Sequence, residues 1–429
     1  YQFYYSVCLK KDYNMLKYIL LFIRKGKLMK NNHNLLMKMK NLEKFSGAIK
    51  RCVAIAMASM LFATTGFSLD THPVKAQEVS SSADKIEIPE ISKDAFKKYK
   101  KISGIGANTI LGADFTYYQQ CLEWGKSYKN YMSQSVDNIF DYVKSQGINT
   151  ISLKVAVNPT GENAYLSLEN AIKTLKAVKA SNTNLKTNLV LLYSDEITYA
   201  GTQNLPADWE KAEKEEQSVT RVESAKTYTR ETIAKLKQAN VLPDIVTIGN
   251  EVNWNFLGIT DGEGWEGWKA MGDISALLKK EGVKNAVSIA AQPDAASVKY
   301  IVQKLGYASV DYDYIGVNVY PDNNTNSYIK SLKNEVESCA PDKQLIVSNV
   351  EYERVNEANT ANVYTQADSI YNLLEATIDE KNAGGLIYNE AAYVGSWKSF
   401  FDDEGDAQVS MAIFAYAQGN ETDTSRDPY

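Results

Sequence analysis

Eight short apolar runs, spaced roughly 30 to 55 residues apart, constrain the fold of this chain more than any other feature. They are Ala107–Ala113, Thr150–Val155, Asn188–Tyr193, Asp244–Asn250, Ala286–Ala291, Tyr314–Tyr320, Gln344–Val350 and Gly385–Asn389. Segments with helical periodicity lie between them, which is the rhythm of β/α units whose parallel strands are buried on both faces. Eight such units predict an α/β fold, a (β/α)₈ TIM barrel that forms a single domain over residues 98–420.

The segments between the runs carry apolar residues at helical spacing. Three examples are Val136, Ile139, Phe140 and Val143; Leu168, Ile172, Leu175 and Val178; and Met271, Ile274, Leu277 and Leu278. We interpret these stripes as packing surfaces without a functional role. The long segment 196–217 follows the third run on the strand-to-helix side, where TIM barrels have their active face.

The fourth run ends in a polar pair, Asn250-Glu251, directly after the apolar and β-branched residues 245–248. A carboxylate at the carboxyl end of a buried parallel strand is where barrel enzymes keep their acid/base groups. A Glu at this position can also be only the first solvated residue of a loop. The barrel pattern around the pair favours the catalytic interpretation.

Histidine occurs twice in the chain, as His33 and His72, and both precede the predicted barrel. A barrel without histidine excludes Ser-His-Asp and Cys-His nucleophiles, His-liganded zinc sites and HExxH metalloproteases. Hydrolytic chemistry must therefore rest on carboxylates, tyrosines, lysines or a cation held by oxygen ligands.

Residues 1–76 are predicted to be a signal or targeting region. Twelve Lys or Arg lie between Lys10 and Arg51, and an apolar run from Cys52 to Leu69 follows them. This is the pattern of a bacterial-type secretory signal with Met29, Met37 and Met39 as candidate starts, whereas a transmembrane anchor is the alternative. We expect a secreted or cell-surface protein with a linker at 77–97 and a polar tail at 421–429.

Charge limits the partners of the remaining chain. Outside residues 1–76 there are 34 basic and 49 acidic side chains, a formal net charge of −15. We therefore expect no nucleic acid and, after signal removal, no membrane as a partner. Cys121 and Cys339 lack metal-ligand spacing, and the sequence leaves open whether they are two thiols or one bridge.

Short strings at several strand ends resemble glycoside hydrolase family 53, the endo-β-1,4-galactanases of a large clan of retaining glycosidase barrels. They are Gly112-Ala113-Asp114; Tyr193-Ser194-Asp195 with Gly201, Gln203 and Trp209; Gly249-Asn250-Glu251; Asp313-Tyr314-Ile315-Gly316 through Tyr320-Pro321; and Gly385 to Glu390 with Gly395-Ser396-Trp397. The resemblance runs from about Ile105 to Ala417 and rests on the order and spacing of these strings together.

The resemblance implies an acid/base role for Glu251, with Asn250 bonded to a sugar hydroxyl, the 2-OH at the cleavage site. Glycosidases need a second carboxyl group beside the first. The family's nucleophile is a Glu at the end of the seventh strand, where the ungapped match has Asn349. If that strand is entered two residues later, Glu351 takes the position, and it points the same way as Asn349 because two residues are one strand period. Without the shift Glu351 lies about 6.6 Å further along, whereas retaining pairs are about 5 to 5.5 Å apart.

Further side chains are candidates for substrate binding, and each of them could instead have only a structural role. The candidates are Asp114, Tyr193, Asp195, Asn318, Tyr320, Glu390 and Trp254. The aromatic residues among them offer faces on which sugars stack, but in a chain with 28 Tyr any one tyrosine is more often packing. The acidic ones can equally fix loops by hydrogen bonds.

The chain departs from the family pattern at three supporting positions. Lys154 stands where the family has an Arg, Leu192 where it has a His before Tyr193, and Asn389 where it has a Trp before Glu390. A lysine cannot reproduce the two-pronged arginine contact that orients a carboxylate.

Three functions are therefore open. The first is a secreted, endo-acting, retaining glycoside hydrolase, a monomer that cleaves plant β-1,4-galactan or arabinogalactan. The second is a catalytically impaired galactan-binding protein on the same barrel, and the third is a hydrolase of the same clan with another β-glycan specificity. No cofactor is required, no metal enters the catalytic site, and a structural calcium stays open.

Overall fold

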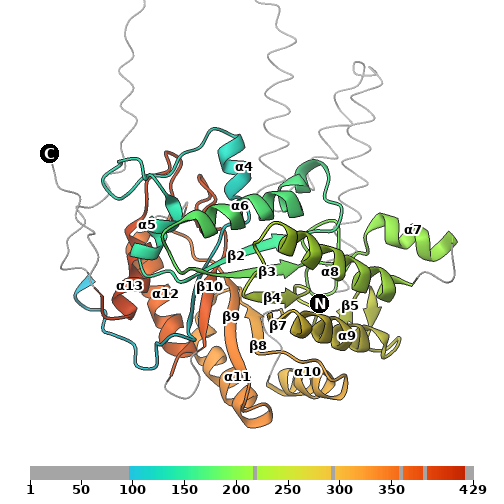
Figure 1. Cartoon of the computed structure of the whole chain (residues 1–429). Coiled ribbons are helices and arrows are strands. Elements are labelled where there is room, and N and C mark those ends of the chain that lie inside the picture. The colour runs from blue at the N-terminus through green and yellow to red at the C-terminus, as the bar shows by residue number, and fades with distance from the viewer. Residues whose placement is uncertain (1–95, 216–219, 291–294, 357–360, 380–383, 421–429) are drawn as a thin grey trace, which may run out of the picture. The chain divides into compact units, whose positions relative to one another are not determined.

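The computed structural model describes residues 96–215, 220–290, 295–356, 361–379 and 384–420. Eight parallel strands close into a barrel in the order β1-β10-β9-β8-β7-β4-β3-β2 (Figure 1). The strands are β1 (Ile110–Asp114), β2 (Thr150–Val155), β3 (Lys186–Leu191), β4 (Ile245–Ile248), β7 (Lys284–Ile289), β8 (Tyr314–Asn318), β9 (Gln344–Val350) and β10 (Gly385–Tyr388). The predicted (β/α)₈ barrel is confirmed, and each of the eight runs overlaps a strand.

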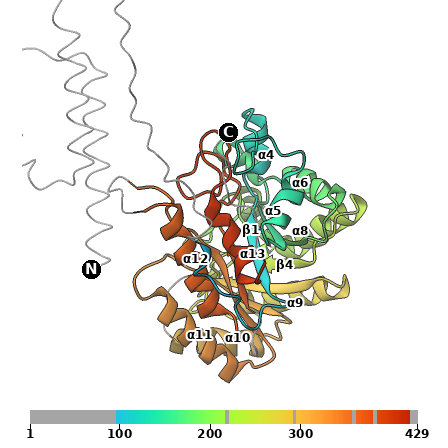
Figure 2. The same cartoon turned by 90° about the vertical axis from the view of Figure 1, so that its left-hand side faces the viewer.

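Helices surround the barrel on its outer side (Figures 1 and 2). They are α4 (Tyr118–Glu123), α5 (Ile139–Ser145), α6 (Leu168–Ala180), α7 (Ala207–Glu215), α8 (Arg221–Gln238), α9 (Glu266–Lys280), α10 (Ala295–Tyr307), α11 (Thr325–Cys339), α12 (Val363–Thr377) and α13 (Ile413–Ala417). Two 3₁₀ turns, η3 (Gly161–Leu166) and η4 (Val409–Ala412), and a short hairpin of β5 (Asn255–Phe256) and β6 (Ile259–Thr260) complete the described elements.

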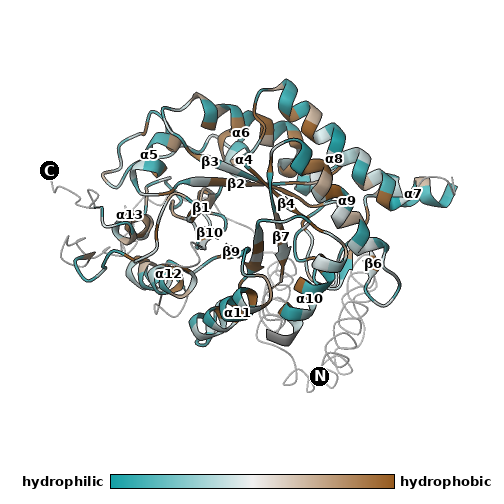
Figure 3. Cartoon of the chain, turned by 60° about the horizontal axis from the view of Figure 1, so that its bottom comes forward, coloured by the Kyte–Doolittle hydropathy of each residue, from teal (hydrophilic) through white to brown (hydrophobic). Residues whose placement is uncertain are grey.

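Helix α6 illustrates why these segments are helical. Its N-cap Ser167 accepts a hydrogen bond from the backbone N–H of Asn170, which satisfies one of the free donors of the first turn. Leu175 and Val178 are buried on the face towards the barrel. Figure 3 shows the same pattern for the ring of helices, whose outer faces are mainly hydrophilic.

The inside of the barrel changes character along its axis. One layer is apolar and consists of Ile110, Ile245, Ala286, Tyr314, Ile346 and Ile387. Two residues further along several strands, towards their carboxyl ends, the inward positions are polar: Thr247 donates to Asn188, and Asn188 donates to Ser152. Because inward positions repeat every two residues, the next ones lie at the strand ends, where the candidate site is.

Strand β9 contains a bulge that the sequence pattern did not predict. Val317 of β8 pairs with Val347, but the next residue, Asn318, pairs with Asn349, so that Ser348 is one residue extra. Both Ser348 and Asn349 line the small cavity inside the barrel. The bulge therefore reverses the alternation after residue 348.

The predictions for the two ends of the chain cannot be compared with the structure. The signal region 1–76, most of the linker 77–97 and the tail 421–429 lie outside the described part of the chain. Within that part, no helix is long and apolar enough to cross a membrane. Cys121 and Cys339 are both free thiols.

Candidate active site

Glu251 lies in the first turn after β4 and is 3% exposed. Gly249 directly follows the strand with φ +71°, and a side chain there would come within 2.3 Å of a Val252 methyl. Glu251 itself has φ +55°, a conformation that costs energy for a residue with a side chain. The backbone thus turns sharply and places Glu251 just after the carboxyl end of β4, whereas its acid/base role stays a prediction.

Three donors hold the Glu251 carboxylate. Oε2 accepts a hydrogen bond from the backbone N–H of Ala200 at 2.8 Å. Oε1 accepts from Nδ2 of Asn318 at 3.1 Å and from the Tyr320 hydroxyl at 3.1 Å. The long segment after β3 and the end of β8 therefore position this group together.

Asn250 is joined to the same framework. Its Oδ1 accepts from Nδ2 of Asn318 at 2.9 Å, and its Nδ2 donates to the Thr198 carbonyl at 2.6 Å. Both side chains are almost fully buried. These two hydrogen bonds hold the Asn250 amide in one orientation. Asn250 also lines the small cavity inside the barrel.

Tyr320 is a permanent donor to Glu251. Burial of the hydroxyl and the nearby Glu251 carboxylate raise the pKa of Tyr320 well above its ordinary value. The hydroxyl therefore keeps its proton throughout the working pH range. The rest of the side chain is open, with 57% of Tyr320 exposed at the barrel mouth.

The bulge in β9 decides which way Glu351 points. In a strand that alternated regularly from the inward Ile346, residues 348 and 350 would face inward and Glu351 outward. Because of the extra residue, Asn349 faces the interior and Val350 packs in the outer core. Glu351 then returns to the inner side, one position beyond the end of β9.

The sequence left two registers open for this strand, and the structure has a third arrangement, a one-residue bulge. Asn349 pairs with Asn318, the last residue of β8. Glu351 lies at the mouth, where it lines a cavity of about 450 Å³ together with Tyr320. Tyr320 thus hydrogen-bonds one glutamate and lines the same cavity as the other.

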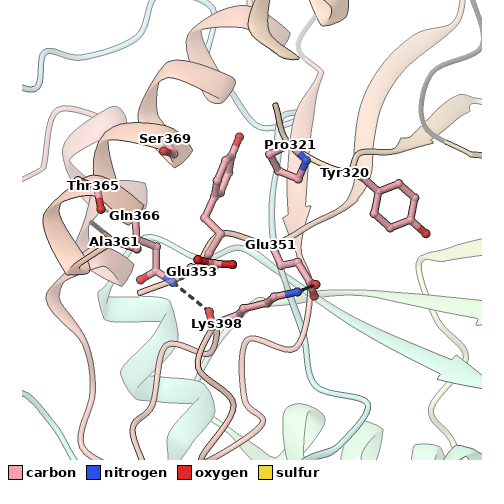
Figure 4. A pocket seen from close by; sticks show the side chains of 10 residues that line it. Tyr320, Pro321, Glu351, Glu353, Ala361, Thr365, Gln366, Ser369 and Lys398 are labelled. Carbon is pink, nitrogen blue, oxygen red and sulfur yellow. Dashed lines mark hydrogen bonds and ion pairs between the residues drawn. The ribbon is translucent and has the colours of Figure 1, made fainter. Parts of the chain in front are cut away.

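Lys398 forms an ion pair with Oε1 of Glu351 (Figure 4). Figure 4 shows the lysine side chain extended towards the carboxylate from the loop after β10. Glu353, Thr365 and Ser369 line the same cavity.

Two of the departures from the family pattern contact each other. Nζ of Lys154 donates to Oδ2 of Asp114 and to Oδ1 of Asn389, both at 2.8 Å. Nδ2 of Asn389 in turn donates to Oε2 of Glu351 at 2.8 Å. Asp114, Lys154 and Asn389 all occupy inward positions at strand ends, so the fold joins them into one chain of hydrogen bonds that ends on Glu351.

Glu390 lies next to this chain and carries a perturbed carboxyl group. Burial, and secondarily the negative charge of Glu351, raise the pKa of Glu390. Oε2 of Glu390 accepts a hydrogen bond from the Ser396 hydroxyl at 3.0 Å. Its backbone has φ +50°, so this strand end is also sharply turned.

Other predicted site residues lie elsewhere. Tyr193 is 2% exposed and bonds Thr229 of α8, because it follows the outward positions Leu189 and Leu191 of β3. Asp195 accepts from the backbone N–H groups of residues 158 and 207 and fixes two loops. Trp254 is 40% exposed and packs on Tyr300 at 5.5 Å between ring centroids.

Sequence reasoning missed Lys398 and the Ala200 backbone N–H as partners of the two glutamates. Lys398 directly follows the Gly395-Ser396-Trp397 string, which was the available signal. A backbone donor leaves no residue-type signal at all.

No candidate metal cluster of three or more His, Cys, Asp or Glu occurs among the residues described by the structure. The structural calcium that the sequence left open therefore gains no support from them.

A parallel barrel with glutamates at the carboxyl ends of two strands, one of them hydrogen-bonded by a tyrosine, defines a (β/α)₈ protein of glycosidase type. The chain belongs to glycosyl hydrolase family 53, whose family model matches residues 110–423.

Curated relatives are similar over part of their length. The chain is 29% identical over 232 residues to the arabinogalactan endo-beta-1,4-galactanase of Cellvibrio japonicus, a match that covers 51% of this chain and 59% of the relative. It is 24% identical over 327 residues to the endo-beta-1,4-galactanase of Bacillus subtilis, covering 69% and 72%. The chain thus spans about three fifths of the length of the first of these relatives.

Solved structures show the same fold. The family 53 catalytic domain of Ignisphaera aggregans matches with a TM-score of 0.66 at 20% identity, covering 75% of this chain and 99% of that domain. One of two fungal beta-1,4-galactanases matches with a TM-score of 0.62 at 21% identity, covering 71% and 98%.

Proposed function

We propose that this protein is an endo-acting, retaining glycoside hydrolase that cleaves β-1,4-galactan or arabinogalactan. The observation that carries the proposal is the placement of Glu251 and Glu351 directly after β4 and β9, with Tyr320 hydrogen-bonded to Glu251 and lining the same cavity as Glu351. The names of the relatives supply the substrate class.

The two glutamates have different roles in the proposed reaction. An oxygen of Glu351 attacks the anomeric carbon while the glycosidic C–O bond breaks, and Glu251 gives its proton to the leaving oxygen. The product is a glycosyl ester on Glu351 and a free chain end. Glu251 then takes a proton from water, whose oxygen attacks the anomeric carbon and releases Glu351.

Exposed aromatic residues support binding of a polymer. Tyr199, Trp254, Tyr320 and Trp397 follow four different strands on the strand-to-helix side and are each at least 40% exposed. Aromatic faces on several loops at one end of a barrel suit a sugar chain that passes over the site. We also propose that the protein is secreted and monomeric, and these two parts of the proposal rest on the sequence alone.

The test is the release of reducing ends from linear β-1,4-galactan by the purified protein and by Glu251→Gln, Glu351→Gln and Asn349→Glu variants. We expect the parent to be active and both Gln variants to lose about 10³-fold or more, because each removes a group that changes its bonding in the transition state. Activity of Glu351→Gln near the parent's would exclude Glu351 as the nucleophile.

A second candidate function has one observation in its favour. Both oxygens of Glu351 are occupied, one by Asn389 and the other by Lys398. A galactan-binding protein without turnover would retard in a gel that contains galactan but release no reducing ends. A gain of activity in Asn349→Glu over an inactive parent would identify it.

A further inference from the structure

The Glu351 carboxylate is held by two donors of different character. Nδ2 of Asn389 donates to Oε2 at 2.8 Å, and Lys398 pairs with Oε1. Attack on a sugar carbon needs a lone pair of one oxygen with a clear path to that carbon, and a donor paired with that oxygen competes with the substrate for it.

Asn389 is fixed from behind. Its Oδ1 accepts from Lys154, whose Nζ is also paired with Asp114 at 2.8 Å. The side chains of Lys154 and Asp114 are only 10% and 2% exposed. Asp114 also accepts hydrogen bonds from the backbone N–H and the hydroxyl of Thr116. Because the amide oxygen faces a buried cation, the amide N–H group has to face Glu351.

Lys398 is anchored at its backbone, while its side chain is held by the ion pair with Glu351. The Lys398 carbonyl accepts hydrogen bonds from the Tyr388 hydroxyl at 2.8 Å and from Nε2 of Gln366 at 2.9 Å. Its side chain is 24% exposed at the edge of the cavity. The ammonium group lies 5.3 Å from the centre of the exposed Trp397 ring. Because the lysine side chain is flexible, the ring face can bind the ammonium group when it leaves Glu351.

We propose that Asn389 is a positioning residue that stays on Oε2 of Glu351, whereas Lys398 covers Oε1, the attacking oxygen, and leaves it when substrate enters. This inference rests on the proposed function of Glu351. Lys154 and Asn389 then act as a pair, because the buried lysine orients the amide that orients the carboxylate. Lys398 acts as a competitor of the substrate for the same oxygen.

The experiment measures kcat and KM on linear β-1,4-galactan for the parent, Asn389→Asp and Lys398→Met. Lys211→Met on the exposed surface of α7 serves as the matched lysine control. Thermal melts of all four proteins show whether each variant is folded. If Asn389→Asp melts far below the parent, Asn389→Leu replaces it, since it has a similar shape without the donor.

Asn389→Asp distinguishes a residue that orients Glu351 from one that only supports Lys154. The introduced carboxylate still pairs with Lys154, so a residue that only supports the lysine would tolerate it. A donor to Glu351 would not, because two carboxylates at this distance repel. We expect kcat at pH 7 to fall about 10²-fold, with less loss at pH 5 where the pair can share a proton.

Lys398→Met is expected to lower KM roughly two- to five-fold. This factor corresponds to the strength of a partly exposed ion pair, which in the parent competes with the substrate for Oε1 of Glu351. Asn389→Asp within threefold of the parent in kcat, or an unchanged or raised KM for Lys398→Met, would overturn the assignment of the two donors. A parent that releases no reducing ends contradicts the proposed function itself, which distinguishes the two failures.

Discussion

At the scale of single residues, the site is a set of carboxylates whose surroundings differ. Glu251 receives three hydrogen bonds from neutral donors. Glu351 is held by one amide and one cation, and Asp114 by a buried lysine. These different partners allow neighbouring acids to take different roles, because the donors and charges around a carboxyl group decide whether it holds a proton.

The buried pair of Lys154 and Asp114 gives a stability prediction. Lys154→Met leaves the Asp114 carboxylate, 2% exposed, without its cation. We expect a loss of about 3 kcal/mol or more in the free energy of unfolding, measured by denaturant titration. A double variant with Asp114→Asn should recover part of this loss, whereas an equally unstable double variant would show that charge burial is not the cause.

Glu390 gives a pH prediction. Because the pKa of Glu390 is raised in the folded protein, the unfolded chain loses this proton first as the pH rises above about 4.3. Stability due to this group therefore decreases with rising pH until the folded group ionises. Glu390→Gln, which can still accept from Ser396, should melt about 1–3 °C above the parent at pH 7 and show no such gain at pH 4. Equal melting differences at both pH values would refute this.

At the scale of elements, the bulge in β9 decides whether the second glutamate reaches the site. Gly316 of β8 makes room for it, since a Cβ at this position would lie 2.7 Å from the Ser348 side chain. Strand β10 pairs on the other edge with the same one-residue shift. The orientation of Glu351 is thus a property of three neighbouring strands.

Gly316→Ala tests this element. The added methyl group has to displace the bulge, so we expect a destabilisation of about 1–3 kcal/mol and a fall in kcat without a matching rise in KM. Thermal melting and kinetics on galactan measure both. An alanine variant with the parent's kcat would show that Glu351 does not depend on the bulge.

The sequence predicted the strands because buried parallel strands are continuous apolar runs, and Thr150–Val155 and Gln344–Val350 match their strands at both ends. It did not predict the bulge, since Ser348 and Asn349 carry no signal that separates a bulge from a regular strand. It placed Glu251 correctly at a strand end but not Tyr193, which follows the outward positions of β3. The contacts from Lys154 to Asn389 and from Glu351 to Lys398 join distant segments, so only the closed barrel reveals them.

At the scale of the whole molecule, the barrel brings together side chains from several strands, and its described residues contain no cluster of three or more His, Cys, Asp or Glu that could hold a metal ion. We expect EDTA to change the melting temperature by less than about 1 °C. At a calcium concentration a hundredfold above the Kd, a bound ion would add about 2.7 kcal/mol to the free energy of unfolding. Its removal would therefore lower the melting temperature by several degrees. Such a fall would indicate a site built from ligands other than clustered acids.

The most direct test of the account is to trap the glycosyl ester. An oligogalactoside with a fluorine at C2 of the reacting sugar and a good leaving group should form the ester but release it slowly. Peptide mass spectrometry of the trapped protein should find the sugar on Glu351. A label on Glu390, or none under conditions in which the protein cleaves galactan, would contradict the assignment of Glu351 as the nucleophile.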